Sequence, residues 1–248
     1  MNRSIRQLRI VLVALLAVLG IGVASVHAVA ESELGQLTEE TAPSGYVETT
    51  DASALSGDFT MEEFAQLTGQ SIEGVNAADL REFAVFARTW DAADGSRLLI
   101  LLVRTPSDAE AASFLAGILD SAGSAGYPTG VPGTVGRIIQ GATPARIVAW
   151  RQGRYSVQIV SAAPTAEAAA AAAKQLAIDQ VARLTPAVGE PGGEVESDKK
   201  GIAYALGGLV GLGAIVGLVV LVATRASKWQ QGPPPPPPPP PPSQQPFG

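Results

Sequence analysis

The residue types that carry most enzyme and metal chemistry are nearly absent from this sequence. Its 248 residues contain no Cys, and the single His, His27, lies in an N-terminal segment that we predict to be removed. A chain without Cys and His has no thiolate nucleophile, no disulfide, no His-based triad and almost no ligand set for a transition metal. We therefore expect a protein that is not an enzyme and that uses no cofactor and no metal.

Carboxylates and arginines are the chemistry that remains. Asp91 and Asp94, beside Trp90, can serve as the carboxylate pair of a hydrolase or hold calcium weakly, but Asp in a hairpin turn commonly binds its own backbone. A carboxylate-dependent hydrolase is therefore the least favoured function. Arg97 and Arg154 stand at equivalent strand starts, which makes them candidate anion-binding positions unless they are simply exposed strand ends.

Glycines are concentrated between residues 123 and 136. Gly126, Gly130, Gly133 and Gly136 suggest a phosphate-binding loop, but no Gly-Lys-Ser/Thr follows them and no helix starts there. We interpret this segment as an ordinary loop.

The longest apolar stretch is Gly201–Ala223, with 23 residues and no charge. A helix of this length, with a rise of about 1.5 Å per residue, crosses a hydrocarbon core of roughly 30 Å. The stretch therefore predicts a transmembrane helix in the lipid bilayer. Small residues recur four apart along it, at Ala203, Gly207 and Gly211 and again at Gly213 and Gly217. This spacing lets helix backbones approach closely and predicts packing against a partner helix or within a homodimer.

The N-terminus determines the predicted topology. Residues 1–30 combine three arginines, an apolar run and a terminal Ala-Val-Ala, which is typical of a secretory signal peptide, or else form an uncleaved anchor. Both interpretations place the bulk of the chain outside the cytoplasm and residues 224–248 inside. We expect a single-pass protein of the cell membrane.

The C-terminal tail contains ten consecutive prolines, Pro233 to Pro242. Such a run forms a stiff polyproline II rod of roughly 31 Å, which can dock in an aromatic-lined groove. No Lys or Arg adjoins the run to fix its register, so a simple spacer is the alternative.

Charge is distributed unevenly. All 23 carboxylates lie between Glu31 and Asp198, an interval with only 10 basic residues before Lys199. An acidic surface repels phosphate backbones, so we expect no nucleic-acid partner.

Residues 59–185 are predicted to fold as an α+β domain, between an acidic flexible lead-in (31–58) and an acidic stalk (186–200). A capping box at Thr60 starts a short helix, residues 82–104 form a hairpin whose second strand is buried on both faces, and Thr165 caps a long helix. The further expected elements are a helix at 109–122, strands at 137–140, 145–151 and 154–162, and a helix at 165–184.

An internal repeat relates two parts of this domain. Residues 96–112 align with residues 153–169 at a shift of 57, each a strand followed by a helix. A duplicated ββα unit and two independent units with the same patterning both explain the match. Either way we predict a mostly antiparallel sheet of about five strands with two long helices on one face.

The function that fits these features best is binding of a protein or cell-wall partner by the extracytoplasmic domain. The alternative is an accessory subunit of a membrane transport or secretion complex, held there by the apolar helix.

Overall fold

The most apolar strand of the sequence, β4 (Arg97–Arg104), lies in the middle of the sheet. In this computed structural model, which describes residues 32–49, 54–72, 75–123, 125–141, 143–192 and 201–215, β4 is buried from its first residue through Val103. β3 (Ala84–Ala92) and β8 (Tyr155–Ala162) pair with its two edges, both antiparallel. The predicted hairpin, with a second strand buried on both faces, is confirmed.

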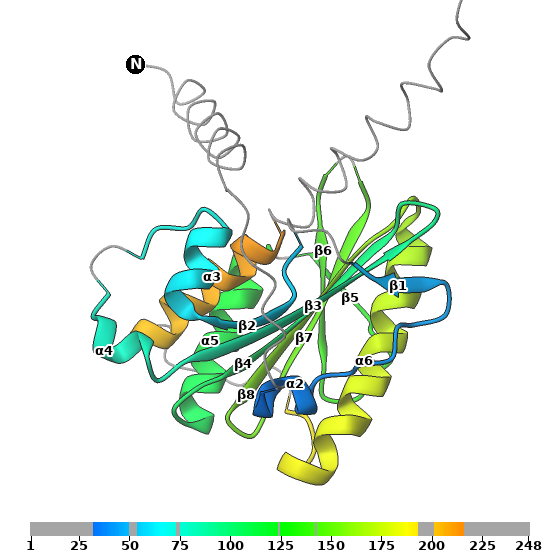
Figure 1. Cartoon of the computed structure of the whole chain (residues 1–248). Helices are drawn as coiled ribbons and strands as arrows, with labels where there is room; N and C mark the ends of the chain where they lie inside the picture. Colours follow the sequence, from blue (N-terminus) through cyan, green and yellow to red (C-terminus); the bar gives the residue numbers. More distant parts are fainter. Residues whose placement is uncertain are drawn as a thin grey trace, which may run out of the picture.

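The sheet has eight strands in the order β1-β3-β4-β8-β7-β6-β5, with β2 also paired to β3 (Figure 1). On one side it continues through β7 (Ala145–Gln152), β6 (Val135–Ile139) and β5 (Gly126–Tyr127). On the other side β1 (Tyr46–Glu48) and β2 (Gly57–Thr60) share the outer edge of β3. The expected number of five strands is wrong, because β1, β2 and β5 have only two to four residues each and show no usable alternation.

The two long helices cover opposite faces of this sheet. α5 (Asp108–Ser121) packs with one parity of β4, Leu99, Leu101 and Val103. α6 (Ala166–Val188) packs with the other parity, Leu98, Ile100 and Leu102. The prediction of both helices on one face is therefore wrong. A strand that is apolar at every position needs cover on both faces, and two helices on one side would leave half of it in water.

The strands obey the symmetry that the internal repeat predicts, but the helices do not. Leu101 and Gln158, which are equivalent positions at the shift of 57, are direct partners across β4 and β8. Two ββα units related by a two-fold axis through this pair, normal to the sheet, would carry both helices on the same face. Because α5 and α6 lie on opposite faces, the similarity extends only to the strand pattern.

Helix starts follow the sequence signals closely. Thr60 and Glu63 form a reciprocal capping box at α3 (Met61–Leu67), and the Thr165 side chain accepts a hydrogen bond from Ala168 N at the start of α6. α6 continues past Pro186 to Val188, into the segment predicted as a stalk. A one-turn helix, α4 (Ala77–Leu80), precedes β3.

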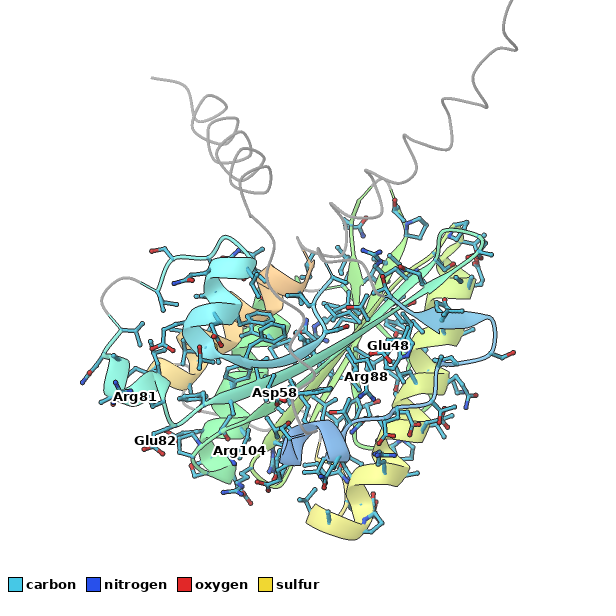
Figure 2. The ribbon with its side chains drawn as sticks, in the orientation of Figure 1. Glu48, Asp58, Arg81, Glu82, Arg88 and Arg104 are labelled. Atoms are coloured by element: carbon cyan, nitrogen blue, oxygen red, sulfur yellow. The ribbon has the colours of Figure 1, made fainter. Side chains whose placement is uncertain are left out.

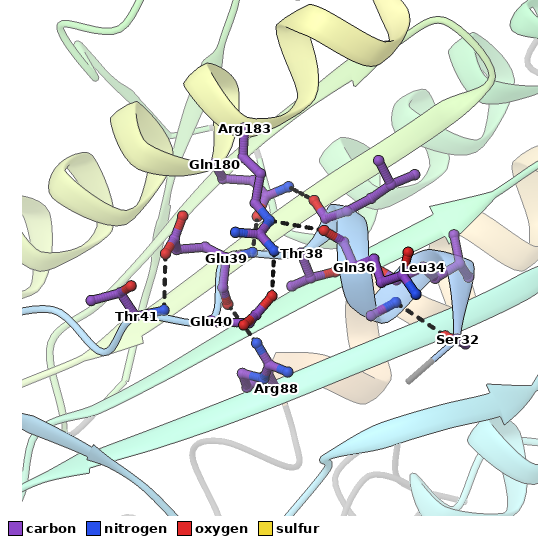
Figure 3. A network of polar contacts seen from close by, with 12 residues as sticks. Ser32, Leu34, Gln36, Thr38, Glu39, Glu40, Thr41, Arg88, Gln180 and Arg183 are labelled. Carbon is purple, nitrogen blue, oxygen red and sulfur yellow. Dashed lines mark hydrogen bonds and ion pairs between the residues drawn. The ribbon is translucent and has the colours of Figure 1, made fainter. Parts of the chain in front are cut away.

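The lead-in predicted to be flexible is folded onto α6 where the structure describes it. α2 (Glu33–Leu37) places Leu34 in the core, and the Gln180 side chain donates to Leu37 O at 2.8 Å and accepts from Glu39 N at 2.7 Å. Arg88 of β3 donates to Glu39 O at 2.9 Å (Figure 3). Three backbone polar groups of this segment, Leu37 O, Glu39 N and Glu39 O, are thus satisfied by α6 and β3.

Residues 202–215 form a helix that packs on the domain between α3 and α5 (orange in Figure 1). The described part of this helix, residues 202–215, rises about 21 Å, and Ala203, Leu206, Val210 and Ala214 join the core. Nowhere in the described residues is there a helix with both the length and the apolar character needed to cross a membrane. The transmembrane helix and the single-pass membrane interpretation built on it are therefore wrong.

Candidate functional site

α5 has two contact surfaces, one on the sheet and one on the helix of residues 202–215. The second contact uses the same periodicity on both helices: Phe114, Gly117, Ile118 and Ser121 face Tyr204, Gly207, Gly208 and Gly211. Positions i, i+3, i+4 and i+7 lie on one face of a helix, so each helix presents one continuous stripe. With Thr68, which follows α3, the four α5 residues form what we call the glycine groove.

The glycine groove and its helix are packed backbone to backbone. An ideal Cβ added to Gly207 would lie 1.9 Å from the Phe114 carbonyl oxygen, and one on Gly117 would lie 2.1 Å from the Tyr204 carbonyl oxygen. A Cβ on Gly211 would lie 2.2 Å from Ser121 Oγ. At Gly207 and Gly117 the clashing atoms belong to the backbone, so glycine is required there for the observed approach. At Gly211 the nearest atom is a side-chain oxygen that can rotate away, and the next is Ile118 Cα at 3.0 Å.

A polar contact orients the helix at the rim of the groove. The Tyr204 hydroxyl donates to Asp120 Oδ2 at 2.7 Å, at an exposed position. The apolar contact is therefore accompanied by one directional hydrogen bond, which fixes how far the helix slides along α5.

The structure brings most of the predicted helix-packing residues to this contact. Ala203 is 6% exposed within the core, and Gly207, Gly211 and Gly213 all lie against the groove. They face α5 and Thr68 of their own chain, whereas the sequence predicted a second membrane helix. Gly217 and the predicted tail-binding residues Pro233 and Pro242 lie outside the described residues.

Arg97, a predicted anion-binding residue, is engaged by a carboxylate of its own hairpin. Its Nε donates to Asp91 Oδ1 at 2.5 Å and its Nη2 to Asp91 Oδ2 at 3.0 Å, and the residue is 1% exposed. Asp94 accepts from Ser96 N at 2.9 Å. The two aspartates considered for hydrolysis therefore hold the hairpin together.

Arg154, the other predicted anion-binding residue, lies far from Arg97. β4 and β8 pair Arg97 with Ala162 and Arg104 with Tyr155, so the two arginines stand at opposite ends of the strands. Arg154 lies opposite Thr105, eight residues along from Arg97, which is about 26 Å of strand. Arg154 is exposed, and its guanidinium lies 5.7 Å from the centre of the Tyr155 ring. They do not form one site.

The glycine-rich loop contains a feature that the sequence interpretation missed. Residues 126–132 and 134–137 line a shallow hollow of about 510 Å³ at the β5–β6 edge of the sheet. Arg137 lines it, Arg146 lies 5.7 Å from the Tyr127 ring centre, and Lys174 Nζ lies 3.0 Å from an ideal Cβ on Gly130. We call this hollow, with Arg146 and Lys174, the basic hollow.

Tyr127 is the aromatic residue of the basic hollow; it is partly buried, and its hydroxyl oxygen is fully buried. Burial raises the pKa of its hydroxyl to about 12, while the nearby charge of Arg146 acts in the opposite direction. Its Oη has no hydrogen-bond partner among the described residues. The ring therefore acts mainly as an apolar surface beneath a guanidinium.

Ion pairs in the described residues are concentrated away from the basic hollow. Arg88 pairs with Glu48 at 3.5 Å on the β1–β3 side (Figure 2), and the other pairs join Arg97, Arg104 and Arg183 to carboxylates. Residues 121–166 contain four arginines and no Asp or Glu. This carboxylate-free interval is the sequence signal that could have located the basic hollow.

Comparisons with known proteins give no further guide to function. No protein family, no characterised protein sequence and no solved structure matches this chain.

Proposed function

We propose that this protein is a non-catalytic interaction domain whose glycine groove binds an apolar helix with small residues four apart. The observation that carries the proposal is Gly117. Glycine in the middle of a helix costs roughly 0.8–1 kcal/mol relative to alanine. At Gly117 the missing side chain admits the backbone of Tyr204 and Gly208, which accounts for a residue that α5 alone would not favour.

The occupant of the groove is a helix of this chain, and the partner we infer is the same helix of a second copy. Each copy carries both the groove and the helix, so exchange between two copies replaces every contact by an identical one. The expected complex is thus a homodimer formed by helix exchange, in equilibrium with the self-docked monomer.

Introduced cysteines test this proposal cleanly, since the chain has no Cys of its own. Asp120→Cys and Tyr204→Cys place thiols at the rim, where the wild-type side chains meet without contributing to the close packing. One copy carries Asp120→Cys, a second copy carries Tyr204→Cys, and a short thiol-to-thiol crosslinker joins them. We expect a cross-linked dimer of the two different copies, which disappears when Gly117→Leu is added to the first.

A chain carrying both cysteines separates the two parts of the proposal. Crosslinking within that chain, with no dimer from the mixed copies at any concentration, would leave the groove intact and refute the exchange. Absence of both products would refute the groove itself. Thr41→Cys, at an exposed position next to Ala42, which packs on the α6 face of the sheet, should give no product with Asp120→Cys and serves as the proximity control.

A further inference from the structure

The basic hollow at the β5–β6 edge is independent of the glycine groove and lies on another part of the domain. We propose that it binds an extended acidic peptide segment, whose carboxylates meet Arg146, Lys174 and Arg137. Three features support this ligand: the local charge, the placement of the cations and an open backbone edge.

Local charge favours an anion at the basic hollow. Of the 23 carboxylates of the chain, none lies between residues 121 and 166, which contribute Arg137, Arg146, Arg151 and Arg154. Within the described residues, neither Arg146 nor Lys174 forms an ion pair with a carboxylate. Charge-assisted hydrogen bonds to these two side chains are therefore available to a ligand.

The cations are positioned by the loop itself. Tyr127 holds the Arg146 guanidinium at 5.7 Å from its ring centre, a cation–π distance. Nη1 of Arg146 donates to Ala145 O at 2.9 Å, so the carboxylate would be met by its other N–H groups. Gly130, with φ +69°, has no side chain where Lys174 reaches the loop, and Lys174 Nζ would stand 3.0 Å from a Cβ at that position. A larger residue at Gly130 would displace the ammonium group from the hollow.

The edge of the sheet supplies backbone groups beside these cations. Ile138 N donates to Ala125 O at 2.8 Å, and Gly126 and Tyr127 stand opposite Arg137 and Gly136. Hydrogen-bonded and non-hydrogen-bonded pairs alternate along an antiparallel ladder, so the N–H and C=O of Gly126 point away from β6. An extended peptide can pair with this exposed glycine, as in strand addition to a sheet edge.

A peptide fits better than a nucleic acid. The hollow is shallow, and the whole chain carries a net charge of −6, which opposes the long-range approach of a polyphosphate. A short segment with a few carboxylates experiences less of this repulsion while it still meets both cations.

The test uses the full chain and, as the probe, a fluorescein-labelled ten-residue peptide that contains three glutamates. Binding is measured by fluorescence anisotropy at low and at physiological salt. Arg146→Gln with Lys174→Gln should weaken binding about tenfold or more, because two charge-assisted contacts are lost. Arg81→Gln with Arg154→Gln changes the net charge equally at exposed positions outside the hollow and should change the dissociation constant less than about twofold. Gly117→Leu should leave the peptide affinity unchanged, which separates this site from the glycine groove.

Three results would overturn the proposal. They are absence of peptide binding by the wild type, equal weakening by the two double variants, and tighter binding of a single-stranded oligonucleotide than of the peptide. Lys174→Gln alone, at an exposed position on α6, keeps the test valid if the Arg146 variant fails to fold. It should still weaken peptide binding measurably, and no change with this variant would also refute the site.

Discussion

Gly117 in α5 lies directly against Tyr204 in the helix of residues 202–215, so that a Cβ on Gly117 would stand 2.1 Å from the Tyr204 carbonyl oxygen. α5 is consequently held between the sheet and a second helix. This arrangement explains why six consecutive residues of α5, from Phe114 to Leu119, are all buried. The contact joins two segments that are about 90 residues apart in the sequence.

Two neighbouring glycines give the sharpest test of this contact. A Cβ on Gly207 would lie 1.9 Å from Phe114 O, whereas one on Gly208 would lie 3.7 Å from Gly117 O, an ordinary contact distance. Gly207→Ala should lower the melting temperature because it forces the helices apart. Gly208→Ala should leave it unchanged or raise it, since alanine favours helix by about 1 kcal/mol over glycine.

Thermal melts of the two variants under identical conditions make the comparison. The gain in helix propensity is the same for both substitutions, so it cancels. Equal melting temperatures for Gly207→Ala and Gly208→Ala would mean that the helix does not dock as described.

The sequence predicted those elements whose signals are local. The capping residues Thr60 and Thr165 and the hairpin of β3 and β4 depend on neighbouring residues, and all are found. The side on which each helix packs is set by what each face of the sheet still exposes, which is a tertiary property. Burial of β4 on both faces, which the sequence predicts, requires cover on each face, and two helices on one face do not provide it.

The candidate sites were harder to predict, for a different physical reason. The glycine spacing from Gly207 to Gly213 predicts close packing with a partner helix in a membrane, but an apolar helix can find its complement in lipid or in protein, and composition does not distinguish them. Arg97 and Arg154 appeared equivalent because of the repeat, while strand pairing places them at opposite ends. The basic hollow depends on Lys174 of α6 meeting Gly130, a contact that no local pattern contains.

Two buried glutamines should respond in opposite ways to the same substitution. Gln158 is 1% exposed, and neither its Nε2 nor its Oε1 has a hydrogen-bond partner in the described part of the chain. Gln158→Met, a change of similar shape, should raise the free energy of unfolding by about 1–3 kcal/mol. Gln180→Met removes two hydrogen bonds, to Leu37 O and from Glu39 N, and should lower it by a similar amount.

Urea denaturation of both glutamine variants measures these changes directly. A loss of stability in Gln158→Met would show that its amide is satisfied in solution, for example by a buried water, and would contradict the expectation.

The buried ion pair of the β3–β4 hairpin should matter far more than an exposed one. Asp91→Ala leaves the Arg97 guanidinium, 1% exposed, without its carboxylate, and should lower the free energy of unfolding by about 3–5 kcal/mol. Arg104→Gln breaks the partly exposed pair with Glu33, at 3.5 Å, and should cost at most about 1 kcal/mol. Urea denaturation at low and at high salt measures both losses of stability. Only the loss in Arg104→Gln should depend clearly on salt. Similar losses for the two variants would contradict the burial of Arg97.

Tyr127 should give the protein a distinct titration step at high pH. Burial raises the pKa of its hydroxyl from 10.0 to about 12, so the neutral form is favoured in the folded state. The contribution of the neutral Tyr127 to the free energy of unfolding is fully present below pH 10, the pKa of this tyrosine in the unfolded chain. It is lost as the pH rises towards about 12. Among four tyrosines, ultraviolet titration after a rapid pH jump should show one step near pH 12, which Tyr127→Phe removes. Tyr46→Phe should retain that step. Loss of the step in this control variant would show that it belongs to Tyr46 and would contradict the prediction.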